Sequence, residues 1–182
     1  MTLKSQIVNF LKTNPELKKV NFRFMTHRIY PSGYSVDVAD LIDKDYIGLS
    51  KAFFGKAAAS YLMDSNKMIL SNSFSITSDY DLSFLVHECT HALSDYQKAG
   101  YGSRFEHEAV GYLAEAFWRE AKGLTSLGGT GIRTITHKIA ASMLSSGNYT
   151  VSASDGYALL NAVRAEPHYK TKSDETYIGD GF

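Results

Sequence analysis

The sequence predicts an α+β fold that is mostly helical, with a small antiparallel sheet ahead of its longest helices. Apolar residues recur at helical spacing through much of the second half of the chain, whereas strand-like patterns are confined to short stretches before residue 71. Ser followed three residues later by Asp or Glu marks the starts of several helices. Strands and helices in such an order are typical of α+β proteins.

A single domain over residues 1–182 is expected. The chain has 182 residues, only three prolines, and no internal repeat or low-complexity linker. Its predicted parts are an N-terminal region, a central hairpin with a helix pair, and C-terminal helices, over residues 1–57, 58–123 and 124–182.

The first elements are a helix, a strand and a hairpin, predicted at residues 3–12, 20–25 and 58–70. The hairpin turns at Asp64–Asn66. Residues 29–56 give no clear pattern, and the turn residues Pro31–Gly33 are expected to interrupt them.

Four helices are predicted to follow. Ser78 is expected to open the first, which runs to about Lys98, and Ser103 the second, which ends near Gly123. After a glycine-rich loop at 128–131 comes a third helix, up to Gly147. The last helix begins at Ser152 and ends before Pro167, because proline cannot continue a helix.

Composition narrows the classes of function. Lys plus Arg and Asp plus Glu both number 19, so no net charge draws the chain to nucleic acid or to an anionic membrane. The single Cys89 cannot form an internal disulfide and is expected to be a small buried residue. No apolar run is long enough to span a membrane, and the N-terminus has no secretory signal pattern. We expect a cytoplasmic protein, or one exported without a cleaved signal.

The motif His87-Glu88-Cys89-Thr90-His91 has the form H-E-x-x-H and lies within a predicted helix. Residues four apart occupy the same helix face, so His87 and His91 are expected to bind one zinc ion. Glu88 is one step round the helix, where its carboxylate can act as the general base without closing the open coordination position. Apolar residues flank the motif, and buried histidines need polar partners.

The third ligand is expected on the next helix, where Glu106, Glu108 and Glu115 are candidates. Glu108 is favoured, because Glu106 pairs with Ser103 in the helix cap and Glu115 is expected to pair with Arg119 at the surface. One pattern favours Glu106 instead, since it shares a helix face with the apolar residues Val110, Leu113 and Phe117.

Other polar residues suggest weaker hypotheses. Asp95 shares the face of His87 and His91, where it either orients a ligating imidazole or is simply a surface aspartate. His27 and His107 have no partner pattern and are expected at the surface or at a helix cap.

The stretch from His87 to Tyr96, together with Glu108-Ala109, resembles the active-site helix pair of the thermolysin-like gluzincin metallopeptidases. Over residues 58–120, the pattern is also similar to small bacterial metallopeptidase-like domains, some of which serve as toxin or effector modules. Tyr112 departs from this pattern, because gluzincins usually have aspartate four residues after the ligand glutamate.

This resemblance implies a zincin-like domain with one zinc ion per chain and a peptide or protein substrate. It neither requires nor excludes an inhibitor or immunity partner that binds this domain. It also implies a Tyr or His that stabilises the oxyanion, for which His137, His168 and Tyr169 are candidates. Residues 67–71 resemble the edge strand along which gluzincins pair an extended peptide.

The sequence therefore predicts a zinc-dependent hydrolase, most simply a peptidase. A zinc-activated water is the expected nucleophile, with Glu88 as its base. Two alternatives stay open: a zinc-stabilised interaction module without catalysis, and an amidase that acts on cell-wall peptides.

Overall fold

The computed structural model describes residues 1–53, 57–98, 102–124, 131–169 and 176–177, and it confirms the predicted α+β fold. The helices are α1 (Leu3–Thr13), α2 (Ala39–Asp43), α3 (Asp79–Tyr96), α4 (Arg104–Ala121), α5 (Ile132–Ser146) and α6 (Ala153–Ala165). The strands are β1 (Phe22–Phe24), β2 (His27–Ile29), β3 (Gly48–Ala52), β4 (Ala59–Leu62), β5 (Lys67–Ser71), β6 (Gly102–Ser103) and β7 (Thr176–Tyr177). Three shorter helical segments are η1 (Leu17–Lys19), η2 (Gly33–Val38) and η3 (Met63–Ser65).

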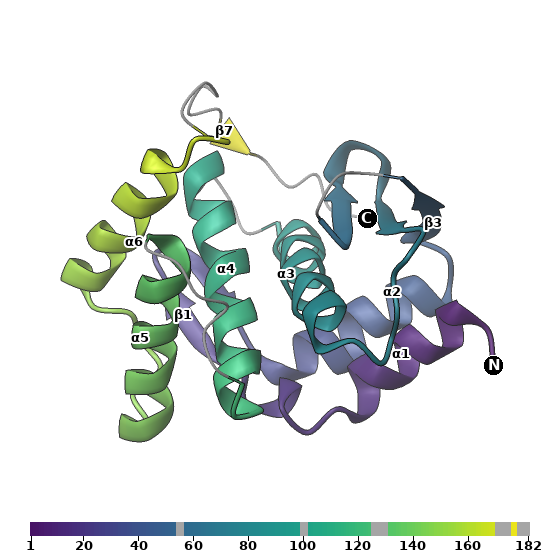
Figure 1. The fold of residues 1–182 in the computed structure, drawn as a ribbon, viewed down its shortest axis with the longest axis horizontal. Coiled ribbons are helices and arrows are strands. Elements are labelled where there is room, and N and C mark those ends of the chain that lie inside the picture. Colours follow the sequence, from purple (N-terminus) through teal and green to yellow (C-terminus); the bar gives the residue numbers. More distant parts are fainter. Residues whose placement is uncertain (54–56, 99–101, 125–130, 170–175, 178–182) are drawn as a thin grey trace.

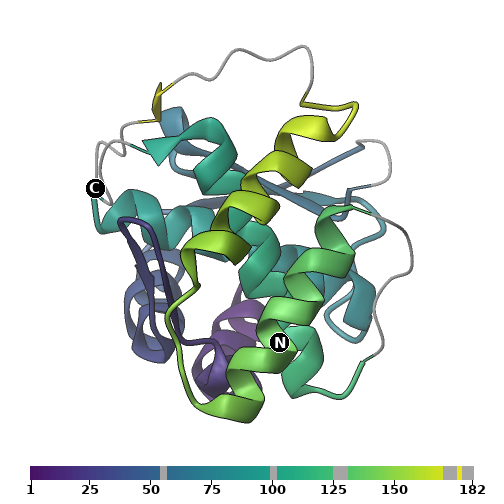
Figure 2. The same cartoon turned by 90° about the vertical axis from the view of Figure 1, so that its left-hand side faces the viewer.

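Helices α3 and α4 pack against each other in the middle of the molecule (Figure 1). Helices α5 and α6 cover the far side of α4, as the turned view in Figure 2 also shows. On the other side of α3 lie the hairpin strand β4 and the segment η2. The two central helices are therefore enclosed by other elements on both sides.

The predicted hairpin is confirmed, but its sheet is mixed. Strands β4 and β5 pair antiparallel across the η3 turn, where Asn66 takes the left-handed conformation. Strand β3 joins the other edge of β5 in parallel, so the strand order is β3-β5-β4. This corrects the expectation that residues 67–71 form an edge strand. The edge strand beside α3 is β4.

Contrary to expectation, the turn residues Pro31–Gly33 do not interrupt the regular secondary structure. Residues 31 and 32 are helical and lead into the π-helix η2 and then α2. Proline is compatible with the first turn of a helix, because the backbone N–H that it lacks would have no partner there. The Tyr34 hydroxyl and Thr90 Oγ1 of α3 lie within hydrogen-bond distance at 2.7 Å, so η2 supports the helix that carries the motif.

The predicted helix starts are confirmed. The Oγ atoms of Ser78, Ser103 and Ser152 each accept a hydrogen bond from the backbone N–H three residues later. Gly147 ends α5 with a φ of 69°, the conformation in which glycine is favoured. The predicted glycine stop at Gly100 and most of the loop at 128–131 lie outside the described residues.

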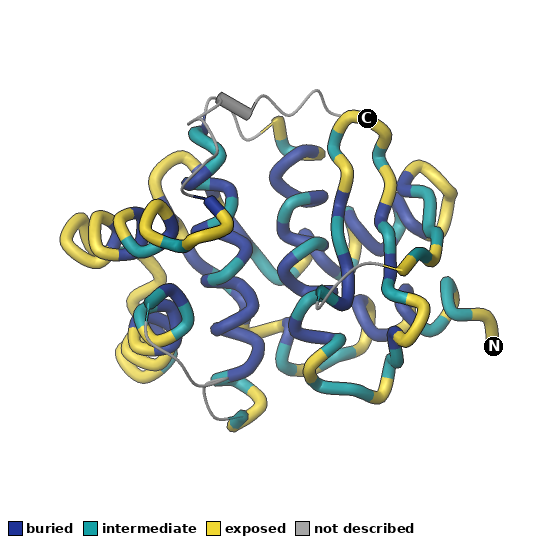
Figure 3. The backbone as a smooth tube through the Cα atoms, turned by 45° about the horizontal axis from the view of Figure 1, so that its top comes forward, coloured by how far each residue is buried: buried dark blue, intermediate teal, exposed yellow. Residues whose placement is uncertain are grey.

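The core runs between the two central helices and the N-terminal elements (Figure 3). Its largest fully buried side chain, Trp118 of α4, donates a hydrogen bond from Nε1 to Asn14 Oδ1 at 3.1 Å. The rings of Phe22 and Phe117 stack with centroids 5.2 Å apart, which fixes β1 against α4. Among the described residues, no helix combines the length and apolar character that crossing a membrane requires.

Gly33 is needed for the close approach of η2 to α3. A Cβ atom at this position would lie 2.5 and 2.8 Å from the two Cδ atoms of the buried Leu93. We expect Gly33→Ala to lower the free energy of unfolding by about 1–3 kcal/mol through overpacking. Gly48→Ala is the control, since a Cβ there meets nothing within 4 Å. Equal stabilities for the two variants in chemical denaturation would contradict this view of the packing.

Candidate metal centre

Three side chains predicted as metal ligands converge between α3 and α4. His87 and His91 lie one turn apart on α3, with ring centroids 4.8 Å apart, and Glu108 approaches from α4. One ligand atom from each residue can be chosen so that all three lie within 4.8 Å of one another. Glu106 and Glu115, the other two candidates, do not belong to this group.

The donor set suits zinc. In a tetrahedral zinc site with bonds of about 2.0–2.2 Å, neighbouring ligand atoms lie about 3.3–3.6 Å apart. His87 Nε2 and Glu108 Oε2 are 3.6 Å apart, which is close to that spacing. Two imidazoles and one carboxylate are also the ligand types of catalytic zinc sites that keep one position open. His87, His91 and Glu108 could therefore hold one zinc ion.

A glycine on α4 lets the two helices approach closely enough to form this group. A Cβ atom at Gly111 would lie 2.6 Å from His87 Nε2 and 2.8 Å from two ring carbons of His87. The imidazole thus occupies the space that any side chain at position 111 would fill. Tyr112 packs edge-on against the same ring, with centroids 4.7 Å apart. Gly111 and Tyr112 together fix where His87 can lie.

Glu108 was predicted from the sequence, but the complete face of α4 that surrounds His87 was not recognised. It consists of Glu108, Gly111, Tyr112 and Glu115, at the i, i+3, i+4 and i+7 spacing of one helix face. A search for apolar periodicity cannot find it, because two of the four residues are glutamates. The available signal was a glycine between acidic residues at helical spacing, in a helix that follows the H-E-x-x-H motif.

Glu88 is partly buried and points toward the sheet. Its Oε2 accepts a hydrogen bond of 2.7 Å from the backbone N–H of Tyr61 on the edge strand β4. Burial raises the pKa of Glu88 to about 7, helped by the charges of Glu108 and Glu115 and opposed by His87 and the Tyr61 N–H. A carboxylate with a pKa near neutrality is suited to accept and return a proton at physiological pH.

The ligand candidates have strongly shifted pKa values. Burial lowers the pKa of His87, but the adjacent Glu108 carboxylate and the charges of Glu88 and Glu115 outweigh burial and raise this pKa to about 9. Burial opposes ionisation of Glu108, but His87, His91 and Tyr169 overcome it and hold the pKa of Glu108 at about 2. The pKa of His91 falls to about 4 through burial and the nearby His87. The surplus of carboxylate charge around His87 would favour a bound cation.

Of the three candidates for the oxyanion-stabilising residue, Tyr169 reaches the site. Its hydroxyl donates a hydrogen bond of 2.7 Å to Glu108 Oε2 and lies 3.4 Å from the hydroxyl of Tyr112. His168 packs edge-on against the Tyr169 ring, and His137 on α5 pairs through Nδ1 with Glu120 at 2.7 Å. A phenol donor therefore lies beside the candidate ligand Glu108.

Several expectations about polar residues were wrong. Glu115 is 3% exposed and lies beside His87, so it does not form a surface pair with Arg119. His27 and His107 are buried, with ring centroids 4.7 Å apart, and are not surface residues. They were misjudged because the fold of β2 against α4 brings together residues 80 positions apart. Burial lowers the pKa of each to about 4, with a further contribution from a neighbouring histidine.

Asp95 is also buried, so the alternative of a surface aspartate is excluded. Its Oδ2 accepts a hydrogen bond of 2.8 Å from the Tyr61 hydroxyl, which ties α3 to β4. Cys89 is fully buried as expected, and burial raises the pKa of its thiol.

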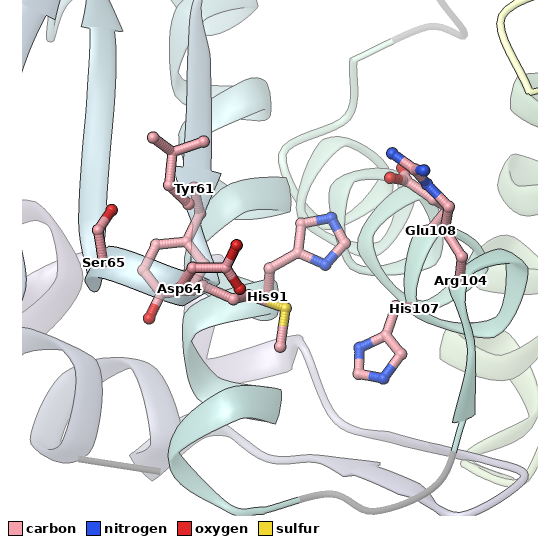
Figure 4. Close-up of a pocket in the computed structure, with 9 residues that line it drawn as sticks. Tyr61, Asp64, Ser65, His91, Arg104, His107 and Glu108 are labelled. Carbon is pink, nitrogen blue, oxygen red and sulfur yellow. The ribbon is translucent and has the colours of Figure 1, made fainter. Parts of the chain in front are cut away.

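A cavity of about 300 Å³ is lined by two of the three ligand candidates, His91 and Glu108. Figure 4 shows His91 in its middle, with Tyr61, Asp64 and Ser65 on one side and Arg104, His107 and Glu108 on the other. Leu62 and Met63 complete its lining. The cavity therefore lies between the end of β4 and the first turns of α4.

No known protein family, curated protein or solved structure was found to match this chain.

The ligand group predicts unequal effects of two neighbouring glutamates. Glu108→Ala should greatly weaken zinc binding, because it removes one of three converging ligands, and Glu106→Ala should leave it nearly unchanged. The purified protein should hold about one zinc ion per chain by elemental analysis, and His91→Ala should lose it. If Glu106→Ala loses the metal while Glu108→Ala retains it, the ligand group is wrong.

Gly111 provides an independent test of the same centre. Gly111→Ala must displace the His87 ring, so we expect zinc affinity to fall by about tenfold or more, as for residues that orient metal ligands. Gly156→Ala on α6 is the control, since its Cβ would meet Phe24 at an ordinary 3.4 Å. Competition with a chelator measures both affinities. Unchanged affinity in Gly111→Ala would show that the His87 ring is not fixed by this contact.

Proposed function

We propose that this chain is a zinc-dependent hydrolase, and specifically a peptidase. One observation carries the proposal: His87, His91 and Glu108 converge from two helices, and the separate carboxylate of Glu88 lies on the same helix as the two histidines. A structural zinc site would have no need of a carboxylate beside it that is not itself a ligand. The combination of ligands and base favours a catalytic site.

The residues of the chain can be assigned to steps of amide hydrolysis. When bound, zinc supplies Lewis acidity, which lowers the pKa of a coordinated water toward about 7 and polarises a carbonyl. Glu88 accepts the proton of the attacking water and returns it to the leaving amine. The Tyr169 hydroxyl, which donates to Glu108 in this structure, is a candidate to share the charge that develops on the carbonyl oxygen if it turns its proton from Glu108 to that oxygen.

The edge strand favours a peptide as the substrate. Ala58 pairs with Ser71 through a backbone hydrogen bond of 2.8 Å, so alternation turns the polar backbone groups of Ala59 and Tyr61 away from β5. No described strand pairs with this outer edge of β4. An extended peptide can add at this edge as a further strand, where it would meet Glu88, which already accepts the Tyr61 N–H.

Replacing Glu88 with glutamine tests the mechanism. Glu88→Gln keeps the shape of the side chain and removes its basicity, so hydrolysis should slow by about a hundred- to ten-thousand-fold while zinc content stays unchanged. The assay measures cleavage of an unfolded protein, of a peptide library and of cell-wall peptides by zinc-loaded wild type and variant.

The substrate panel separates the proposal from its alternatives. Cleavage of cell-wall peptides alone would identify an amidase and contradict the peptidase assignment. A zinc-loaded wild type that cleaves none of the three substrates would favour an interaction module. Equal rates for wild type and Glu88→Gln would exclude Glu88 as the base.

A further inference from the structure

Glu115 is a buried carboxylate that the proposed mechanism does not use. It lies on α4 two turns beyond Glu108 and is 3% exposed. Its Oε2 is buried, has no hydrogen-bond partner, and lies 3.9 Å from Nδ1 of His87. Leaving a buried carboxylate oxygen without a partner costs free energy, so its position beside the imidazole requires an explanation.

The other oxygen of Glu115 is held by two further helices. The Ser83 hydroxyl of α3 donates to Oε1 at 3.4 Å, and Arg133 Nε of α5 lies 3.9 Å from the same atom. The Arg133 guanidinium also lies over the ring of Phe84, 5.9 Å from its centroid. The Ser83 hydroxyl and the positive charge of Arg133 therefore both face Oε1, which leaves Oε2 directed toward His87.

The two nitrogens of His87 face opposite carboxylates. Nε2 is on the side of Glu108, within the ligand group, and Nδ1 is on the side of Glu115. An imidazole can bind a metal through Nε2 only in the tautomer that carries its proton on Nδ1, and an acceptor at Nδ1 favours that tautomer. The gap of 3.9 Å is about 1 Å longer than a hydrogen bond, so a small movement of the ring would close it.

We propose that Glu115 is a positioning residue: its carboxylate accepts the Nδ1 proton of His87 and so presents Nε2 to the metal, while Arg133 on α5 holds the carboxylate in place. This inference rests on the proposed zinc site and extends it to a third helix. Tyr112, one turn before Glu115, packs edge-on against the same ring. The carboxylate that lies near Nδ1 of His87 is that of Glu115.

Glu115→Gln is the informative change. The Ser83 hydroxyl and the positive charge of Arg133 would hold the amide oxygen, so the amide N–H₂ would face Nδ1 of His87. A donor at that position favours the tautomer with its proton on Nε2, which cannot bind the metal. We expect zinc affinity to fall by about ten- to a hundredfold, the usual effect of losing such a partner.

A matched control lies on the same helix. Glu120 pairs with Nδ1 of His137 at 2.7 Å, away from the ligand group, so Glu120→Gln changes an equivalent pair without touching His87. Zinc affinity is measured by chelator competition, and the absorption spectrum of the cobalt-substituted protein reports on ligand geometry. Unfolding of the metal-free proteins separates positioning from stability, since a purely structural Glu115 would lower stability without changing the cobalt spectrum.

Arg133→Met provides a second variant in case Glu115→Gln does not fold. It keeps Glu115 but removes the charge that holds Oε1, so zinc affinity should fall in the same direction by a smaller factor. Wild-type zinc affinity in whichever of the two variants folds would overturn the inference and leave the proposed function intact. So would equal losses in Glu115→Gln and Glu120→Gln. A wild-type protein that binds no zinc would overturn both.

Discussion

The close approach of α3 and α4 at His87 and Gly111 is the contact on which the site depends. With no side chain at Gly111, the imidazole of His87 lies directly against the backbone of α4. This short separation brings Glu108 within reach of both histidines. The segment η2 supports the opposite side of α3 through Tyr34, which is buried and paired with Thr90. The position of the two histidines is thus fixed by packing on both sides of one helix.

The charges around this contact are costly for a folded protein. Glu88, Glu108 and Glu115 place three carboxylates close to two imidazoles. Burial raises the pKa of Glu88, whereas the neighbouring histidines and Tyr169 hold the pKa of Glu108 low against burial. Buried charge of one sign destabilises a fold unless counter-charges or a cation compensate it. Sites that violate the ordinary rules of burial are commonly functional, which agrees with a metal centre at this position.

The edge strand is joined to the same helix through one residue. Tyr61 donates its backbone N–H to Glu88 and its hydroxyl to Asp95, so two carboxylates of α3 hold β4 in place. Because these residues are seven positions apart, they lie two turns apart on one helix face. Tyr61 also lines the cavity beside His91, so this residue links the sheet edge, the proposed base and the cavity. A peptide lying along β4 would meet Glu88 through geometry that the fold itself provides.

Local sequence determined the parts of the site that lie within one helix. The four-residue spacing of His87 and His91, the position of Glu88 between them, and the serine caps of the helices follow from helix geometry alone. The choice among the three glutamates of α4 depended instead on how that helix is rotated against α3. Apolar periodicity could not reveal the rotation, because α4 is buried on nearly every side and the face toward His87 is polar. The roles of Glu115 and Tyr169 and the burial of His27 and His107 depend on contacts between residues far apart in the chain. Only tertiary packing determines such contacts, since no local spacing encodes which helix face meets another.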